Sequence, residues 1–442
     1  MKIAWFTPLR ETTGISKYSI SAVKALSSTA EVEIWCPKPL PLTSDRLREV
    51  LEGIPIYEVS PEAMNWTQME GYDAIVYNLG NNIRFHREIY EVYKRLKGIV
   101  ILHDKVMHHF FATYFLICNG RKDTYARIMS HYYVENTPSY DDRVWETEKV
   151  LDYPLSEMCL INALGVVVHS HETLRAIVKK GVIIPVKHIH HPWYFYGLQE
   201  ERPRLSRQEL GLPEDKVILL FSGNIGRTKR LDMVIESIAY DGLLRNNLYF
   251  LIIGEIGDKA YGMDLKNRIA DEGLSGNVKL LGFVDDEILL NILQNADVCV
   301  NLRYPSTESA SGSLIEQMYF GKPVIVNKIG FYNEVPDDCV VKVKLNKERF
   351  GLRDALKTLV VSPQERMRIG EKAAKWVRQN HSPDEYAAEF LEFANNVWAS
   401  RGRVDFVDKV TEELRAISTN ENFVSKISME IASMFPPLNL PA

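Results

Sequence analysis

Glu308 and Glu316 form an E-x7-E pattern around a run of small residues in the second half of the chain. The run, Ser311-Gly312-Ser313, stands where a loop gives way to a helical pattern. Free N–H groups at a helix start, together with the helix dipole, favour a bound phosphate. Carboxylates accept strongly from the hydroxyls of a ribose or a sugar. The segment therefore predicts a site for a phosphorylated ligand rich in hydroxyls.

Glu316 also fits a purely structural role. Ser313-x-x-Glu316 has the spacing of a capping box, in which the two side chains satisfy backbone N–H groups at a helix start. From these residues alone, the binding and capping interpretations of Glu316 are equal.

Gly14 lies between the first apolar run and the first helical pattern. A glycine at this place lets backbone approach a ligand at the helix start, although by itself an ordinary loop glycine is the simpler interpretation. The turn from Phe6 to Tyr18 lacks G-x-G-x-x-G, so the sequence does not support a nicotinamide or flavin dinucleotide site.

Short apolar runs rich in β-branched residues alternate with amphipathic segments over most of the chain. This alternation predicts an α/β protein with parallel sheets built from right-handed βαβ units. In the first half, the predicted strands are 1–6, 31–36, 73–77, 98–102, 164–168 and 186–190. In the second half, they are 216–221, 248–253, 278–281, 296–301, 323–326 and 339–343.

A polar, proline-containing stretch at 197–215 separates these two series of strands. We therefore predict two α/β domains, at 1–196 and 205–380. Ser382-Pro383-Asp384-Glu385 opens a helix well, because serine caps, proline fits the first helical position and acids favour the positive end of the dipole. That helix is predicted over 383–400, and a weaker helical pattern makes 401–442 a tail.

The composition bounds the class of protein. The 442 residues carry a formal net charge of −5, with 46% hydrophobic and 25% charged residues, which is typical of a folded soluble protein and argues against nucleic-acid binding. The five cysteines lie far apart with no C-x-x-C pair, which predicts buried free thiols in a reducing compartment. No secretory signal or membrane-spanning stretch is evident, so we expect a cytoplasmic protein, with peripheral membrane contact left open.

The segment from Arg303 to Pro336 carries a family resemblance. Glu308, Glu316 and the following Gly321-Lys-Pro-Val-Ile resemble the retaining GT-B glycosyltransferases of family 4 (glycosyl transferases group 1), in particular bacterial members that build surface polysaccharides. The resemblance covers roughly residues 1–400 and is strongest in the C-terminal half. It implies two Rossmann-like domains that face each other across a cleft, with the helix from Pro383 crossing back to the first domain.

The loop from Phe221 to Asp232 resembles the phosphate loop of this family. Lys229 takes the place of the lysine that neutralises the donor diphosphate. The family usually has an arginine directly after the first glycine of this loop, where the present chain has Asn224. Arg227, from within the loop, is the candidate substitute.

Two further short segments resemble motifs of the family. Val284, which follows Gly282 and Phe283, resembles the turn whose backbone lies against the nucleotide base, although Gly282 also suits a plain strand end. His103 follows a predicted strand and resembles the N-domain histidine that reaches the donor sugar. The His- and aromatic-rich segment 105–115 suits an acceptor face or a buried helix, and the buried helix is the favoured interpretation.

The resemblance implies transfer of a sugar from a nucleoside diphosphate to the hydroxyl of a glycan or lipid-linked acceptor, with retention of configuration. The leaving diphosphate gains negative charge that a lysine and a helix start would stabilise. No D-x-D motif and no cluster with metal-ligand spacing is found in the sequence, so we expect no metal and no cofactor beyond the donor. The predicted catalytic residues are His103, Glu308 and Lys229. The predicted donor-binding residues are Gly14, Asn224, Arg227, Val284, Ser311, Gly312, Ser313 and Glu316.

Two other functions are compatible with these motifs. One is a different GT-B enzyme, such as a nucleotide-sugar epimerase or a phosphorylase, against which the E-x7-E pattern counts. The other is a non-catalytic GT-B subunit that binds a partner glycosyltransferase. The presence of Lys229, Glu308, Glu316 and His103 argues against such a subunit, while Asn224 leaves it open.

Overall fold

The chain divides into two compact units. A computed structural model describes residues 1–10, 13–38, 50–133, 149–182, 184–193 and 204–417, together with 427 and 430. The first unit comprises Met1–Tyr194, Thr307–Ala310 and Pro383–Ala442, and the second comprises Phe195–Ser306 and Ser311–Ser382. The chain therefore returns to the first unit twice, once for a short loop and once for the C-terminal helix. Part of the predicted boundary stretch 197–215, namely 197–203, lies outside the described residues.

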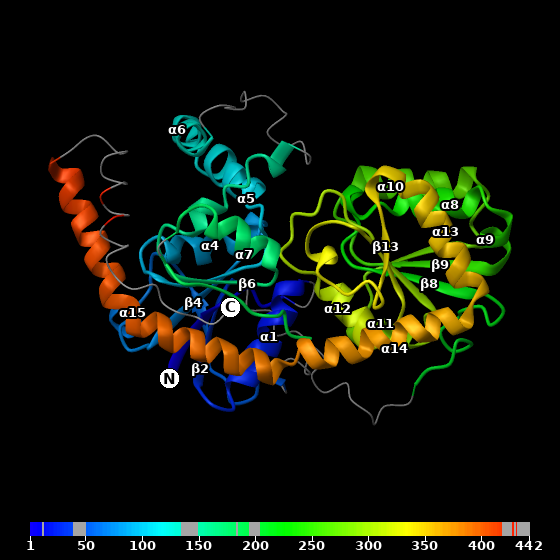
Figure 1. Cartoon of the computed structure of the whole chain (residues 1–442), viewed down its shortest axis with the longest axis horizontal. Coiled ribbons are helices and arrows are strands. Elements are labelled where there is room, and N and C mark those ends of the chain that lie inside the picture. The colour runs from blue at the N-terminus through cyan, green and yellow to red at the C-terminus, as the bar shows by residue number, and fades with distance from the viewer. Residues whose placement is uncertain are drawn as a thin grey trace. The chain divides into compact units, whose positions relative to one another are not determined.

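The first unit is built on a seven-stranded parallel sheet in the order β3-β2-β1-β4-β5-β6-β7 (Figure 1). Its strands are β1 (Lys2–Phe6), β2 (Glu31–Pro37), β3 (Ile56–Val59), β4 (Ala74–Leu79), β5 (Gly98–Leu102), β6 (Ala163–Val168) and β7 (Val186–His188). All of these except β3 were predicted from the sequence. That strand lies at the sheet edge and is mostly exposed or half-buried, so it forms no continuous apolar run.

Helices cover both faces of this sheet. They are α1 (Gly14–Leu26), α3 (Trp66–Met69), α4 (Ile83–Tyr93), α5 (His108–Ala112), the π-helical turn η1 (Thr113–Cys118), α6 (Lys122–Tyr132), the 3-10 turns Lys149–Leu151 and Ser156–Cys159, α7 (His171–Val178) and α15 (Pro383–Ile417). Because strand side chains alternate, Ala4 and Phe6 join the core cluster that contains Ile89 of α4. Trp5 is not in that cluster and meets Phe390 of α15, with ring centroids 5.4 Å apart.

The C-terminal helix α15 packs on the first unit beside α1 and β6 (Figure 1). Gly165 in β6 makes this contact close, since a Cβ atom there would lie 2.6 Å from Val397 and 2.9 Å from Phe393. The helix begins at Pro383 as expected, but it continues without a break to Ile417 instead of ending near 400. Val404 and Val407 are still buried, which is why the weaker helical pattern belongs to the same helix. Of the predicted tail beyond this helix, only 427 and 430 are among the described residues.

The second unit is built on a six-stranded parallel sheet in the order β10-β9-β8-β11-β12-β13 (Figure 1). Its strands are β8 (Val217–Ser222), β9 (Leu248–Ile253), β10 (Val278–Gly282), β11 (Val298–Asn301), β12 (Val324–Asn327) and β13 (Val341–Val343), all at predicted places. Its helices are α8 (Leu231–Ala239), α9 (Gly242–Asn247), α10 (Lys259–Asp271), α11 (Asp286–Asn295), α12 (Gly312–Tyr319), α13 (Glu348–Val361) and α14 (Pro363–Asn380). Short 3-10 turns are η5 (Arg227–Lys229), Gly330–Asn333 and Leu345–Lys347.

Both units are doubly wound, because the strand order reverses at β1/β4 in the first and at β8/β11 in the second. The predicted α/β class with two Rossmann-like units is confirmed. None of the helices in the described part of the chain is both long and apolar enough to cross a membrane.

The segment 105–115 contributes α5 and part of η1, in which Phe110, Phe111 and Tyr114 are buried, in agreement with the favoured buried-helix interpretation. The thiols of Cys36, Cys159, Cys299 and Cys339 are buried as expected. Cys118 is exposed, because η1 ends at the surface there, so the expectation of a buried thiol is wrong at this position.

Candidate functional site

His103 lies at the carboxyl end of β5 in the first unit. Its side chain is buried, and its Nε2 atom lies 2.9 Å from Oδ1 of Asn78 on the neighbouring strand β4. The Nδ2 atom of Asn78 donates a 3.0 Å hydrogen bond to the carbonyl of Phe6. The ring of Tyr18 on α1 meets the His103 ring edge to face, with centroids 4.6 Å apart. A polar chain thus leads from the sheet interior to the His103 ring.

Burial and neighbouring imidazoles lower the pKa of His103 well below its usual value. The imidazoles belong to His169 after β6, His191 after β7 and His86 on α4. Burial removes the water that would solvate a positive charge on the ring, and the neighbouring imidazoles further disfavour that charge. His103 is therefore neutral at physiological pH, and its ring takes part in hydrogen bonds without adding charge.

Glu308 is held in the first unit, although the chain on either side belongs to the second. Its backbone forms an isolated antiparallel bridge with Asp104, the residue after His103. The amides of Lys105 and Val106 donate to the carbonyl of Thr307 at 2.9 and 3.3 Å. The structure therefore brings together two predicted catalytic residues, His103 and Glu308, that are far apart in the sequence.

Ser309 anchors this loop. It is fully buried, and its N–H donates to the carbonyl of His103 at 2.8 Å. Its Oγ accepts from the N–H of His169 at 3.2 Å and donates to Oγ1 of Thr173 at 3.2 Å. The backbone next to Glu308 is thus tied to the ends of β5 and β6 and to α7.

The predicted phosphate loop follows β8 in the second unit. The N–H of Ile225 donates to the backbone carbonyl of Glu255 at 2.8 Å, and the N–H of Gly257 donates to the carbonyl of Ile225 at 3.1 Å, so the loop is tied to the segment after β9. Gly254 has φ +144°, and a Cβ atom there would lie 1.8 Å from the carbonyl oxygen of Gly223. Glycine is therefore required where these two strand ends meet.

Three predicted residues occupy this loop. Asn224 is exposed, and its side chain lies over Gly257. Arg227 is also exposed; its Nε atom lies 3.5 Å from Asp258, and its guanidinium lies 5.3 Å from the centre of the Tyr261 ring. Lys229 is half-buried at the end of η5, with its N–H bonded to the carbonyl of Gly226 at 2.9 Å.

Arg230 does not join this set of predicted binding residues. It donates to the buried carboxylate of Glu348 at 2.6 Å, and Glu348 also accepts from Asn327 at 2.7 Å. These bonds give Arg230 a structural role in holding the start of α8.

The start of α12 contains the run of small residues, as predicted. Ser311 is the N-cap, and its side chain accepts from the N–H of Leu314 at 3.4 Å. Ser313 lies inside the helix, where its Oγ accepts from Asn301 at 2.9 Å. The capping box Ser313-x-x-Glu316 is therefore wrong, because a cap at Ser311 places Leu314, and not Glu316, at the third helical position. Glu316 remains a buried carboxylate in the second turn of α12.

Val284 and Gly14 complete the predicted set. Val284 lies in the turn between β10 and α11, where Gly282 has φ +76° and its carbonyl accepts from Gly254 at 2.8 Å. Gly14 begins α1 and is exposed, with Thr13 as the N-cap. A Cβ atom at Gly14 would meet nothing within 4 Å, so packing in the protein does not require glycine there.

Within each unit, the predicted residues gather where the strands of the sheet end. The first unit holds Gly14, His103 and Glu308, and the second holds Asn224, Arg227, Lys229, Val284, Ser311, Gly312, Ser313 and Glu316. Ligands of open α/β sheets bind at this carboxyl edge. Asn78 and Ser309 were not predicted from the sequence; a polar residue at the end of an apolar strand was the available signal for Asn78.

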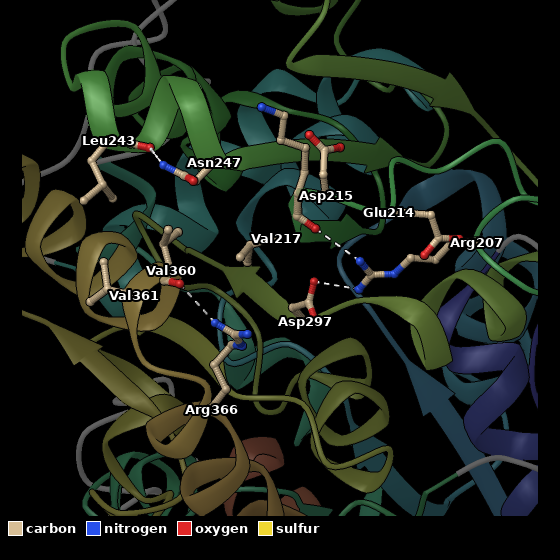
Figure 2. A pocket seen from close by; sticks show the side chains of 11 residues that line it. Arg207, Glu214, Asp215, Val217, Leu243, Asn247, Asp297, Val360, Val361 and Arg366 are labelled. Atoms are coloured by element: carbon tan, nitrogen blue, oxygen red, sulfur yellow. Dashed lines mark hydrogen bonds and ion pairs between the residues drawn. The ribbon is translucent and has the colours of Figure 1, made fainter.

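A pocket of about 340 Å³ lies at the opposite edge of the second sheet (Figure 2). Arg207 lies 2.8 Å from Asp297 there, and Arg366 donates to the carbonyls of Leu359 and Val360 at the end of α13. None of the predicted site residues lines it. Its arginines stabilise the start of the sheet and the end of a helix.

The described residues can also be searched for a group of side chains able to bind a metal ion. Within the described ranges, no group of three or more His, Cys, Asp and Glu side chains is arranged to hold a metal ion. The expected independence from metal stays a prediction.

The second unit resembles a known protein family in sequence. Residues 204–376 match the family model described as glycosyl transferases group 1. This segment is therefore similar to the glycosyl transferases of group 1. The matched segment contains the phosphate loop after β8, the turn at Val284 and the helix α12, and thus every predicted residue of the second unit.

Curated relatives cover only part of the chain. A D-inositol 3-phosphate glycosyltransferase of Arthrobacter sp. is 30% identical over 179 residues, which are 39% of this chain and 41% of that protein. A lipopolysaccharide 1,2-N-acetylglucosaminetransferase of Salmonella typhimurium is 24% identical over 202 residues, which are 43% of this chain and 51% of that protein. The chain thus spans about half the length, or less, of these relatives.

The fold extends over both units. The crystal structure of Anabaena HepE in complex with UDP and glucose superposes with a TM-score of 0.63 at 17% identity, covering 89% of this chain and 99% of that one. At this identity the similarity shows the fold. It confirms the predicted GT-B fold class.

Proposed function

We propose that this protein is a retaining glycosyltransferase of family 4 that transfers a sugar from a nucleoside diphosphate to a hydroxyl acceptor without a metal ion. The observation that carries the proposal is the placement of Glu308 beside His103. Glu308 belongs to the segment that matches the group 1 model, and the first unit holds its backbone beside Asp104 at the end of β5. A structure of similar fold contains UDP and glucose, which supports a nucleotide sugar as the donor.

The second unit would bind the nucleoside diphosphate. Lys229 and the N–H groups at the start of α12, in Ser311, Gly312 and Ser313, would stabilise the diphosphate as it leaves. Glu316 would accept hydrogen bonds from the ribose hydroxyls. The exposed Asn224 and Arg227 would contact the phosphates, and the backbone at Val284 would lie against the base.

The first unit would act on the sugar. His103 and Glu308 would contact its hydroxyls and the charge that develops at the anomeric carbon, while the backbone at Gly14 approaches the donor. The anomeric C–O bond to the diphosphate breaks, and the acceptor oxygen forms its bond on the same face. The acceptor proton passes to the departing phosphate. No protein nucleophile is assigned.

The acceptor class is a glycan or a lipid-linked saccharide of a bacterial surface polysaccharide. The name of the Salmonella relative, a lipopolysaccharide transferase, supports this class. Peripheral contact with the membrane that carries such acceptors is part of the proposal.

A donor screen tests the proposed function. Purified protein is incubated with UDP-, GDP-, ADP- and dTDP-sugars, with and without simple saccharide acceptors, and released nucleotide is measured. We expect one nucleotide class to be turned over, and NMR of the product to show the donor's anomeric configuration. Epimerisation of the nucleotide sugar in the absence of an acceptor would support the epimerase alternative. No turnover and no thermal shift with any of the four nucleoside diphosphates would support a non-catalytic subunit.

A further inference from the structure

Asn78 is a fully buried amide between β1 and His103. Its two polar atoms face two different groups: one lies 3.0 Å from the carbonyl oxygen of Phe6, and the other lies 2.9 Å from Nε2 of His103. A carbonyl oxygen only accepts hydrogen bonds, so the NH₂ group of Asn78 must face Phe6. The amide oxygen must then face His103.

The orientation of Asn78 determines where the proton of His103 lies. An amide oxygen has no hydrogen to donate, so Nε2 of His103 carries the hydrogen of their shared bond. A neutral imidazole has one N–H and one lone pair, so Nδ1 presents the lone pair. The peptide carbonyl of Phe6 thus selects the tautomer of His103 through Asn78.

The remaining neighbours hold the ring still and neutral. Tyr18 meets the ring at an interplanar angle of 82°, and its hydroxyl bonds to that of Tyr386 on α15. The titratable groups that face His103 are Tyr18, His86, His169 and His191, with Tyr386 behind Tyr18. The adjacent carboxylate, Asp104, accepts from the N–H of Asn81 at 2.7 Å.

We infer that Asn78 is a positioning residue that keeps His103 in its Nε2–H tautomer, so that Nδ1 accepts a hydrogen bond from a hydroxyl of the donor sugar. The identity of that partner rests on the proposed function. The tautomer also restricts the sugar class. A hydroxyl can donate to Nδ1, whereas a carboxylate at the same position would place its lone pairs against that of Nδ1. The site thus selects a neutral sugar with a free hydroxyl over a uronic acid.

Nitrogen-15 NMR of the histidine rings tests the tautomer directly in the full-length protein. The His103 signals are assigned by comparison with His103→Gln. We expect Nδ1 in the range of an unprotonated ring nitrogen and Nε2 in that of an N–H nitrogen, unchanged from pH 8 to pH 6. A protonated Nδ1 at neutral pH would overturn the inference whether or not the protein transfers sugar. Sugar transfer that is absent from the wild-type protein would instead count against the proposed function and against the hydroxyl partner.

Two variants test the positioning role. Asn78→Leu removes the acceptor, and we expect kcat/KM for the intact donor to fall about 10-fold or more while nucleoside diphosphate affinity stays the same. Asn78→Asp keeps an acceptor but adds a negative charge, which raises the pKa of His103. Protonated His103 cannot accept at Nδ1, so the pH profile of Asn78→Asp should gain a loss of activity on the acid side that the wild-type profile lacks.

Asn162→Leu is the matched control. Asn162 also donates to backbone carbonyls, those of Tyr93 and Lys94 at 3.1 and 2.9 Å, and it precedes β6 at the other end of the strands. It should lose stability without a change in kcat/KM or in the pH profile. Equal kinetic losses in Asn78→Leu and Asn162→Leu, or an Asn78→Asp profile identical to that of the wild type, would overturn the inference.

Discussion

The N–H of Ser309 donates a 2.8 Å hydrogen bond to the carbonyl oxygen of His103. This bond joins the loop after β11 to the end of β5, and it fixes the backbone beside Glu308 within the first unit. The geometry of the two residues assigned to the donor sugar therefore depends on a short loop anchored by the buried Ser309 and its hydroxyl contacts.

Replacement of Ser309 by Ala tests that dependence. The change removes the Oγ contacts with His169 and Thr173 and leaves a buried N–H unsatisfied, so stability should fall by about 1–3 kcal/mol. We expect kcat to fall as well, with nucleoside diphosphate affinity retained. Ser306→Ala is the control, because Ser306 is also buried but its Oγ has no hydrogen-bond partner among the described residues. Urea unfolding and steady-state kinetics are measured for both variants. Equal losses of stability and of kcat in Ser309→Ala and Ser306→Ala would contradict the dependence on Ser309.

Replacement of Glu316 and of Glu308 by Gln should impair two different properties, nucleotide binding and turnover. Glu316→Gln weakens the acceptor for ribose hydroxyls, so affinity for the free nucleoside diphosphate should fall by roughly 1–2 kcal/mol. Glu308→Gln should leave that affinity intact and lower kcat, because it alters contact with the transferred sugar only. Calorimetric titration and kinetics of the pair distinguish these defects. Normal nucleotide binding by Glu316→Gln together with normal turnover by Glu308→Gln would remove the main support for a glycosyltransferase.

Lys229→Ala removes one positive charge from the phosphate loop. We expect weaker binding of the nucleoside diphosphate and a kcat lowered by about 10²-fold, since the charge on the leaving group is largest in the transition state. Lys266→Ala, an exposed position on α10, should change neither quantity. Unaltered kinetics in a folded Lys229→Ala protein would reduce Lys229 to a solvated surface lysine.

Metal removal should not affect turnover. In the proposed reaction, Lys229 and the start of α12 stabilise the charge on the diphosphate. Activity should therefore be the same after dialysis against EDTA as before. Activity that is lost with EDTA and restored by Mn²⁺ or Mg²⁺ would contradict this expectation.

Gly165→Ala should weaken the attachment of α15 to the first unit. The added methyl group would lie 2.6 Å from Val397, and such overpacking costs about 1–3 kcal/mol. Val397→Ala in the same protein should recover part of the loss by making room. In contrast, Gly402→Ala in α15 meets no atom within 4 Å and should raise stability by about 1 kcal/mol, since alanine favours helix. Equal thermal midpoints for wild type and Gly165→Ala would show that the contact is not tight.

The sequence alone determined the local elements of both units. Buried parallel strands are continuous apolar runs, so their places could be predicted, whereas the exposed edge strand β3 carries no such pattern. The helix start at Pro383 was also predictable, because capping and dipole effects act within one turn. Its end was not: the pattern weakens after 400, and only packing on the first unit keeps Val404 and Val407 in the helix.

Tertiary structure decided which residues share a site. The contact of Ser309 with His103 joins positions that no local pattern relates, because it depends on how the loop after β11 meets another sheet. The tautomer of His103 likewise depends on Asn78 and Phe6, which lie on adjacent strands. The capping interpretation of Glu316 fails because the N-cap is Ser311, two residues before Ser313. The two serines are chemically equivalent in the sequence, and the hydrogen bond from Asn301 to Ser313 separates them in the fold.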